Sequence, residues 1–167
     1  MRRLLSALIM LAGCSAGSHK ATVVTSGGTL VANATLERVV DGDTIEVQIN
    51  GVEERVRLIG IDTPETKKPD SPIECFGPEA SAFTESLLPE GTALYLERDV
   101  EARDSFGRLL AYVYIADTGT FANLEIVRQG YAQPLTIAPN VAHSIEFVDA
   151  ARAAERADAG LWAQCTG

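Results

Sequence analysis

Three carboxylates and a hydroxyl lie near the ends of apolar segments in the first half of the chain. Asp43 begins one such segment, and another, RLIGIDTPE over 57–65, ends with Asp62, Thr63 and Glu65. A carboxylate at the core-facing end of a strand is costly unless a cation or hydrogen-bond donors satisfy it. An oxygen-only set suits a hard cation, Ca²⁺ before Mg²⁺. We therefore predict a Ca²⁺ site formed by Asp43, Asp62 and the Thr63 carbonyl; for Asp43 alone, a solvated turn is the alternative.

Arg57 opens the same apolar stretch, where a buried guanidinium requires an anionic partner. Residues in a strand alternate between the two faces of a sheet. By this rule Arg57 lies on the face opposite Asp62. A twist or bulge, for example at Gly60, must therefore intervene if both side chains serve one site.

A second arginine, Arg108, follows a tight turn at the start of a later predicted strand. It is a candidate for the same site, and the alternative is a surface arginine that pairs with Asp104 or Glu101. A divalent cation, two arginines and a carboxylate that orients or deprotonates water are the parts of a phosphoryl-transfer site. Glu65, just past Pro64, is the carboxylate best placed for the last role.

The hairpin that must position these residues is predicted from the Asn-Gly pair at 50–51, a strong signal for a two-residue turn. Five short strands interrupted by helices indicate a small α+β domain, and a closed five-stranded barrel removes their exposed edges. The last predicted helix carries Val141, Ile145, Val148 and Ala151 at helical spacing. The predicted strands are 36–40, 43–49, 52–61, 92–97 and 108–115, and the three predicted helices begin at Gly77, at Phe121 and at about Asn140.

The N-terminus is typical of an exported protein, with two arginines before an apolar run that is too short to span a bilayer. The sequence LAGC then looks like a bacterial lipobox, so we expect cleavage before Cys14 and a lipid on that cysteine. An ordinary signal peptide with a chance cysteine is the alternative. The protein would be anchored to the cell envelope, in the outer membrane of a Gram-negative host because Ser15 is not an aspartate. The predicted divisions are a signal peptide over 1–13, a lipidated N-terminus and flexible tether over 14–34, and one folded domain over 35–167.

The formal net charge is −9 at pH 7 and would be −11 after loss of Arg2 and Arg3 with the signal peptide. Nucleic-acid binders are usually basic, so this charge argues against broad electrostatic affinity for a polyanion. If Cys14 is lipidated, Cys75 and Cys165 remain, and an exported protein can hold a disulfide between them. Two separate thiols are the alternative. We expect a monomer.

Five sequence blocks, taken together, resemble the signature of the staphylococcal nuclease (thermonuclease) family. They are VVDGDTIEV, VRLIGIDTPET, FGPEASAF, FGRLLAYVY and VRQGYA, in the family order over about 35–162. The resemblance implies an OB-fold barrel with three α-helices. It also implies a Ca²⁺-dependent phosphodiesterase that cleaves DNA and RNA with little sequence preference and leaves 3′-phosphorylated products.

The resemblance also implies a role for each candidate residue of this sequence. The carboxylates and the carbonyl would hold the cation, the arginines would bind the phosphate, and the remaining carboxylate would be the general base. The calcium ligands would be Asp43, Asp62 and Thr63, and the catalytic residues would be Arg57, Glu65 and Arg108.

The chain departs from the family pattern where a substrate would bind. Ser105 and Phe106 stand where the family prototype has a lysine and a tyrosine that contact a terminal phosphate, and Leu135, Thr136 and Ile137 stand where it has base-stacking tyrosines. Stacking is worth about 1–3 kcal/mol per base, so we expect weak substrate binding. A non-catalytic lipoprotein that binds nucleic acid or another ligand is therefore the alternative function. A lipoprotein with a purely structural calcium site is a third.

Overall fold

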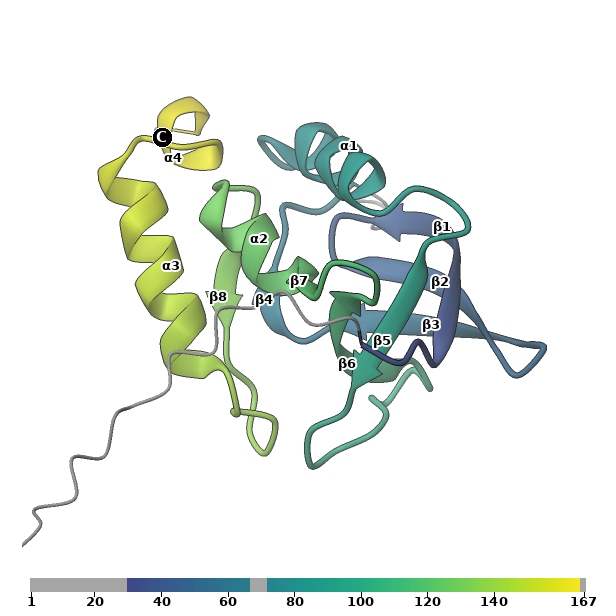
Figure 1. Cartoon of the computed structure of the whole chain (residues 1–167). Helices are drawn as coiled ribbons and strands as arrows, with labels where there is room; N and C mark the ends of the chain where they lie inside the picture. Colours follow the sequence, from purple (N-terminus) through teal and green to yellow (C-terminus); the bar gives the residue numbers. More distant parts are fainter. Residues whose placement is uncertain (1–29, 67–71, 166–167) are drawn as a thin grey trace, which may run out of the picture.

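A closed β-barrel forms the body of the computed structural model, which describes residues 30–66 and 72–165 (Figure 1). The predicted signal peptide, Cys14 and most of the predicted tether lie outside these residues. The barrel strands are β1 (Ala34–Asp41), β2 (Thr44–Ile49), β3 (Val52–Leu58), β5 (Ala93–Glu97) and β6 (Leu109–Ile115). They follow the order β3-β2-β1-β5-β6, and a parallel pairing of β3 with β6 closes the barrel. The predicted α+β class with a five-stranded barrel is confirmed.

The β2–β3 hairpin shows the alternation that the sequence predicts. Asn50 and Gly51 form its turn with φ of 52° and 80°, the left-handed region that a two-residue hairpin turn requires. Ile45, Val47 and Val56 are completely buried inside the barrel. The residues that alternate with them along the two strands therefore lie on the outer face of the hairpin.

The helices form layers beside the barrel. The four helices of the described residues are α1 (Gly77–Leu87), α2 (Ala122–Arg128), α3 (Ser144–Arg156) and the single-turn α4 (Leu161–Gln164), and β7 (Thr120–Phe121) extends the sheet beside β6. Helix α1 packs on β1, and α2 lies between β6 and α3, so that α3 is the layer farthest from the barrel (Figure 1). In the described part of the chain no helix has the length and apolar character needed to cross a membrane.

Helix α3 begins at Ser144, later than the predicted start at about Asn140. The Asn140 side chain accepts a hydrogen bond from the Glu101 N–H (2.8 Å) and donates one to the Glu101 carbonyl (3.0 Å), which holds Asn140 in the preceding loop. The predicted inward face was therefore wrong at Val141 and Ile145, which are exposed. The buried residues of α3 are Phe147, Ala150, Ala151 and Ala154.

The predicted strand over 52–61 is divided in two after Leu58. Its last part forms β4 (Gly60–Asp62), which pairs with β8 (Gln133–Leu135) and not with the barrel. Gly60 has a φ of +83°, a conformation that other residues rarely adopt. The predicted irregularity at Gly60 is confirmed, and it turns the chain out of the barrel wall.

Replacement of Gly60 should destabilise this bend. A Cβ at Gly60 would lie 2.2 Å from Cε2 of Phe147, so Gly60→Ala adds overpacking to the strain of a positive φ. We expect the free energy of unfolding to fall by about 2–4 kcal/mol in urea denaturation. Gly51→Ala is the matched control, because its φ is +80° but an added Cβ would meet no atom within 4 Å beyond its own chain neighbours. This variant should cost only about 1–2 kcal/mol. Equal losses in the two variants would contradict the contact with Phe147.

Cys75 and Cys165 form a disulfide across 90 residues, which confirms the predicted pairing. It joins the segment before α1 to the end of α4. The double variant Cys75→Ser with Cys165→Ser should lower the free energy of unfolding by about 4–5 kcal/mol, because a loop of this length restricts the unfolded chain. The measurement is urea denaturation of both proteins. A midpoint that does not move would show that the bond adds no stability.

Candidate active site

The six predicted site residues line one hollow of about 320 Å³. The hollow lies where β2 begins and β3 ends, and no histidine or cysteine is among its lining residues. Five carboxylates and two arginines contribute to it. The full set is Asp41, Asp43, Thr44, Arg57, Asp62, Thr63, Glu65, Glu74 and Arg108.

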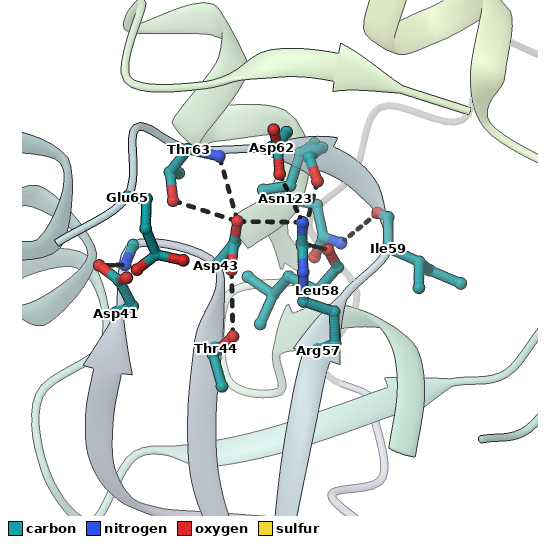
Figure 2. A network of polar contacts seen from close by, with 12 residues as sticks. Asp41, Asp43, Thr44, Arg57, Leu58, Ile59, Asp62, Thr63, Glu65 and Asn123 are labelled. Carbon is teal, nitrogen blue, oxygen red and sulfur yellow. Dashed lines mark hydrogen bonds and ion pairs between the residues drawn. The ribbon is translucent and has the colours of Figure 1, made fainter. Parts of the chain in front are cut away.

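Arg57 connects the two predicted metal-binding carboxylates. Its Nη2 lies 3.1 Å from Oδ2 of Asp43 and donates to Oδ1 of Asp62 at 2.9 Å (Figure 2). The Arg57 and Asp43 side chains are 13% and 11% exposed, whereas the Asp62 side chain is 58% exposed. One guanidinium thus balances a buried carboxylate and a carboxylate that faces the opening of the hollow.

The interruption after Leu58 explains how Arg57 reaches Asp62. Nη1 of Arg57 donates to the carbonyls of Leu58 (2.6 Å) and Ile61 (2.9 Å), which lie on either side of the bend. The guanidinium therefore fills the bend, and the chain returns to it at Asp62. Strict alternation fails here because β4 does not continue β3.

Asp43 is surrounded by hydrogen-bond donors. Oγ1 of Thr44 donates to Oδ1 of Asp43 at 3.0 Å. The backbone N–H and Oγ1 of Thr63 both donate to Oδ2 of Asp43, each at 3.1 Å. The alternative of a solvated turn is therefore wrong, since Asp43 is only 8% exposed. These bonds fix Thr63 next to Asp43.

Asp62 has a less favourable environment. Burial has the largest effect and raises its pKa, Arg57 lowers it, and the negative charges of Asp43 and Glu74 raise it further, so that the pKa lies above its ordinary value. A cation between these carboxylates would lower the pKa of Asp62 through its positive charge, as Arg57 does.

The donor set of the hollow fits a hard cation. Asp43, Asp62 and the Thr63 carbonyl offer only oxygen, as Ca²⁺ requires. Among residues 30–66 and 72–165, no three histidine, cysteine, aspartate or glutamate residues converge into a complete metal cluster. Water or the oxygens of a bound ligand would therefore supply the remaining coordination.

Glu65 is held through its backbone and through its side chain. The Glu65 N–H donates to Oε2 of Glu74 at 3.1 Å, and the Glu74 N–H donates to the Glu65 carbonyl at 3.0 Å. The Thr66 N–H donates to Oε1 of Glu65 at 3.0 Å. The predicted general base is thus positioned at the rim of the hollow by the segment that precedes α1.

Asp41 is a site residue that the sequence did not reveal as one. Its carboxylate accepts hydrogen bonds from Oγ of Ser81 (2.7 Å) and Oγ1 of Thr66 (2.8 Å). Burial has the largest effect and raises the pKa of Asp41, but hydrogen bonds with Glu65, Ser81 and Thr66 outweigh it and hold the pKa below its ordinary value. Asp41 therefore ties the Glu65 segment to α1. Its only sequence signal was that it is an acid beside Gly42.

Asn123 on α2 is a second residue that the sequence did not reveal. It is completely buried, and its Nδ2 donates to the Ile59 carbonyl at 2.9 Å (Figure 2). Its Oδ1 accepts from the Val113 N–H at 2.9 Å. Asn123 thus satisfies a buried carbonyl at the strand interruption, as buried backbone groups require. The sequence offered one indication of this role, a single amide side chain between Ala122 and Leu124 in a short helix.

Arg108 lines the hollow but also has a local partner. Its Nε donates to Oδ2 of Asp104 at 2.7 Å, and its guanidinium carbon lies 5.5 Å from the centre of the Phe106 ring. Arg108 therefore makes the predicted pair with Asp104 and also lines the hollow. Asp104 fixes the direction from which Arg108 approaches.

Comparison with known proteins identifies the family. Residues 55–164 match a family model described as staphylococcal nuclease homologue. The chain belongs to this family. The matched range includes Arg57, 62–65 and Arg108, whereas Asp43 precedes it.

Named relatives agree with this assignment. The chain is 39% identical over 127 residues to a thermonuclease of Staphylococcus intermedius, an alignment that covers 76% of this chain and 74% of the relative. It is 36% identical over 125 residues to a thermonuclease of Staphylococcus hyicus, over 75% of this chain and 72% of the relative. It is 41% identical over 117 residues to the endonuclease YncB of Bacillus subtilis, over 69% of this chain but only 54% of the relative.

Asn123→Asp should loosen the strand interruption without a change in side-chain size. A carboxylate oxygen would face the Ile59 carbonyl, which would then have no donor from this side chain. We expect the free energy of unfolding to fall by about 3 kcal/mol. We expect hydrogen exchange of the β4 amides to accelerate more than that of the β2 amides. Asn33→Asp is the matched control, because Asn33 makes the same pair of bonds to the Leu96 carbonyl and N–H. Unchanged protection of β4 in Asn123→Asp would contradict this role.

Proposed function

We propose that the chain is a Ca²⁺-dependent nuclease that hydrolyses the phosphodiester bonds of DNA and RNA with little sequence preference. The observation that carries this proposal is the single hollow that contains both the oxygen donors and two arginines, Arg57 and Arg108. Cation ligands and phosphate-binding guanidinium groups in one place are what phosphodiester hydrolysis requires. Membership of the staphylococcal nuclease family supports the same activity.

Asp43, Asp62 and the Thr63 carbonyl are the proposed Ca²⁺ ligands. Bound there, Ca²⁺ would supply positive charge to a phosphate oxygen and to a nearby water. The protein holds Asp43 in place beforehand, since Thr63 and Thr44 orient it, and Arg57 orients Asp62 until a phosphate binds. The orientation is thus built into the fold.

Arg57 and Arg108 are the proposed phosphate-binding groups. A guanidinium donates through several N–H groups in one plane, which matches the oxygens of a phosphate. Arg57 exchanges its contacts with the two aspartates for contacts with the phosphate, while Nη1 keeps its backbone carbonyls. Both arginines then stabilise the negative charge that increases as water adds to phosphorus.

Glu65 is the proposed general base. It takes a proton from the attacking water as the new P–O bond forms and the bond from phosphorus to the 5′-oxygen breaks. The 5′-oxygen leaves as a hydroxyl after it gains a proton from solvent, and the phosphate stays on the 3′-oxygen of the other product. Asp41 and Glu74 position the segment that carries Glu65.

The substrate-binding surface beside this site is largely apolar. A hollow of about 390 Å³ contains Phe106, Leu135 and Ile137 together with Arg57 and Arg108. Ser105 supplies no charge where the family prototype has a lysine. These features support weak binding of the substrate, and they keep the non-catalytic binding protein as the second candidate. We also propose that a lipid on Cys14 places the domain outside the cell, at the envelope.

A nuclease cleaves nucleic acid in Ca²⁺, whereas a non-catalytic binding protein only binds it. Single-stranded DNA and RNA are incubated with the protein in Ca²⁺ or in a Ca²⁺ chelator, and the products are tested for a terminal 3′-phosphate. We expect cleavage only with Ca²⁺ and a fall of about 100-fold or more in kcat/KM for Arg57→Lys and for Arg108→Ala. Arg152→Ala is the control, since Arg152 lies on α3 with a side chain that is 67% exposed. Binding of either nucleic acid without cleavage in Ca²⁺ would refute the nuclease and favour the binding protein.

A further inference from the structure

A second hollow, of about 560 Å³, meets the candidate active site at Arg108. We call it the Arg55 hollow. Arg108 belongs to the lining of both, so that a chain-like ligand bound in one can continue into the other. The Arg55 hollow is lined by Glu46, Glu53, Arg55, Phe106, Gly107 and Arg108.

The Arg55 hollow follows the same face of the hairpin as Arg57. On β3, Arg57 pairs with Thr44 of β2. Arg55, two residues earlier and therefore on the same face, pairs with Glu46. Glu46 in turn lies opposite Arg38 on β1. Two residues along a strand span roughly 7 Å. A row of charged side chains therefore begins at Arg55, two strand residues away from Arg57, the proposed phosphate-binding residue.

This row carries two arginines, Arg38 and Arg55, and two glutamates, Glu46 and Glu53. Glu46 is buried between Arg38 and Arg55 and forms ion pairs with both. A hydrogen bond from Arg55 has the largest effect on the Glu46 carboxyl, and with the charges of both arginines it holds the pKa of Glu46 below its ordinary value. Two guanidinium groups thus share one carboxylate. Their side chains remain 60% and 52% exposed, so both can contact a ligand.

Phe106 supplies an apolar platform at the junction. It is 83% exposed, and its ring lies beside the Arg108 guanidinium. A large exposed aromatic side chain next to arginines is the arrangement on which single-stranded nucleic acids stack their bases. Phe106 lines the Arg55 hollow and also the largely apolar hollow that contains Leu135 and Ile137.

We propose that the Arg55 hollow binds the nucleotide that lies beyond the phosphate neighbouring the scissile phosphate of a single strand, a nucleotide that a dinucleotide lacks. Arg55, supported by Arg38, contacts the neighbouring phosphate, and Phe106 stacks on a base. The proposal rests on the nuclease function above and names a part of its substrate site. A single strand is favoured because the bases of a duplex already stack on one another and cannot also stack on Phe106.

The proposal predicts that Arg55 and Phe106 matter more for long substrates than for short ones. Two kinds of substrate are compared in Ca²⁺: a dinucleotide with one phosphodiester bond, and oligonucleotides extended by two nucleotides on the 5′ or on the 3′ side. The readout is kcat/KM for each extended substrate divided by kcat/KM for the dinucleotide. We expect this ratio to fall about tenfold for one of the two extensions in Arg55→Ala and in Phe106→Ala, and further in Arg55→Glu.

Glu46→Gln supplies a test in the opposite direction. The amide keeps the size of the side chain but removes the charge that both arginines share, so the ratio for the same extension should rise severalfold. Circular dichroism verifies that the variant is folded. Arg152→Ala is the matched control, with an exposed arginine on α3, and should leave the ratio unchanged.

The outcomes separate this proposal from the nuclease function. A dinucleotide and oligonucleotides that all resist cleavage in Ca²⁺ would refute the function. Cleavage with ratios that do not change in Arg55→Ala, Arg55→Glu and Phe106→Ala would overturn the Arg55 hollow alone. Dissociation constants for the dinucleotide and for the extended oligonucleotides, measured by fluorescence anisotropy in Ca²⁺, give a corresponding ratio of affinities. This ratio tests the Arg55 hollow even when nothing is cleaved. There too, an unchanged ratio overturns the proposal.

Discussion

The bend between β3 and β4 brings Arg57 and Asp62 together in the candidate site. An uninterrupted strand would send Arg57 and Asp62 to opposite faces. Instead Gly60 turns the chain, and Arg57 holds the bend from within through carbonyls on both sides of it. Asn123 holds the bend from α2 through the Ile59 carbonyl. Because α3 also packs on this region, helices that contribute no side chain to the hollow still control its geometry.

The charge of the protein and the charge of its proposed substrate have the same sign. A net charge of −9 gives no general attraction for a polyanion. Positive charge is instead local, and carboxylates hold each arginine: Asp62 and Asp43 hold Arg57, and Asp104 holds Arg108. This arrangement gives up long-range attraction, while it fixes the guanidinium groups where a phosphate would lie. It favours orientation of a bound strand over its capture from a distance.

The sequence predicted the local parts of this structure and missed those that depend on distant contacts. The Asn-Gly turn follows from its local sequence. The irregularity at Gly60 and the convergence of the six site residues follow from the chemistry of charged groups near apolar strands and from the family resemblance, whereas strict alternation would have separated Arg57 from Asp62. Asn123 was missed because its partner, Ile59, lies 64 residues away. The start of α3 was wrong for the same reason, since Asn140 bonds to the backbone of a different loop. The sequence indicated a distant partner only where chemistry leaves few choices, as for Cys75 and Cys165.

The parallel pairing of β3 with β6 has a consequence for the order of folding. It joins Val56 to Leu109 and thereby closes the barrel, and it also brings Arg57 on β3 close to Arg108, which immediately precedes β6. The β2–β3 hairpin needs only local contacts and can form early, whereas this seam must close a long loop first. The two arginines therefore meet only when the barrel closes. Until the seam forms, the hairpin carries Arg57 without the second arginine of the site.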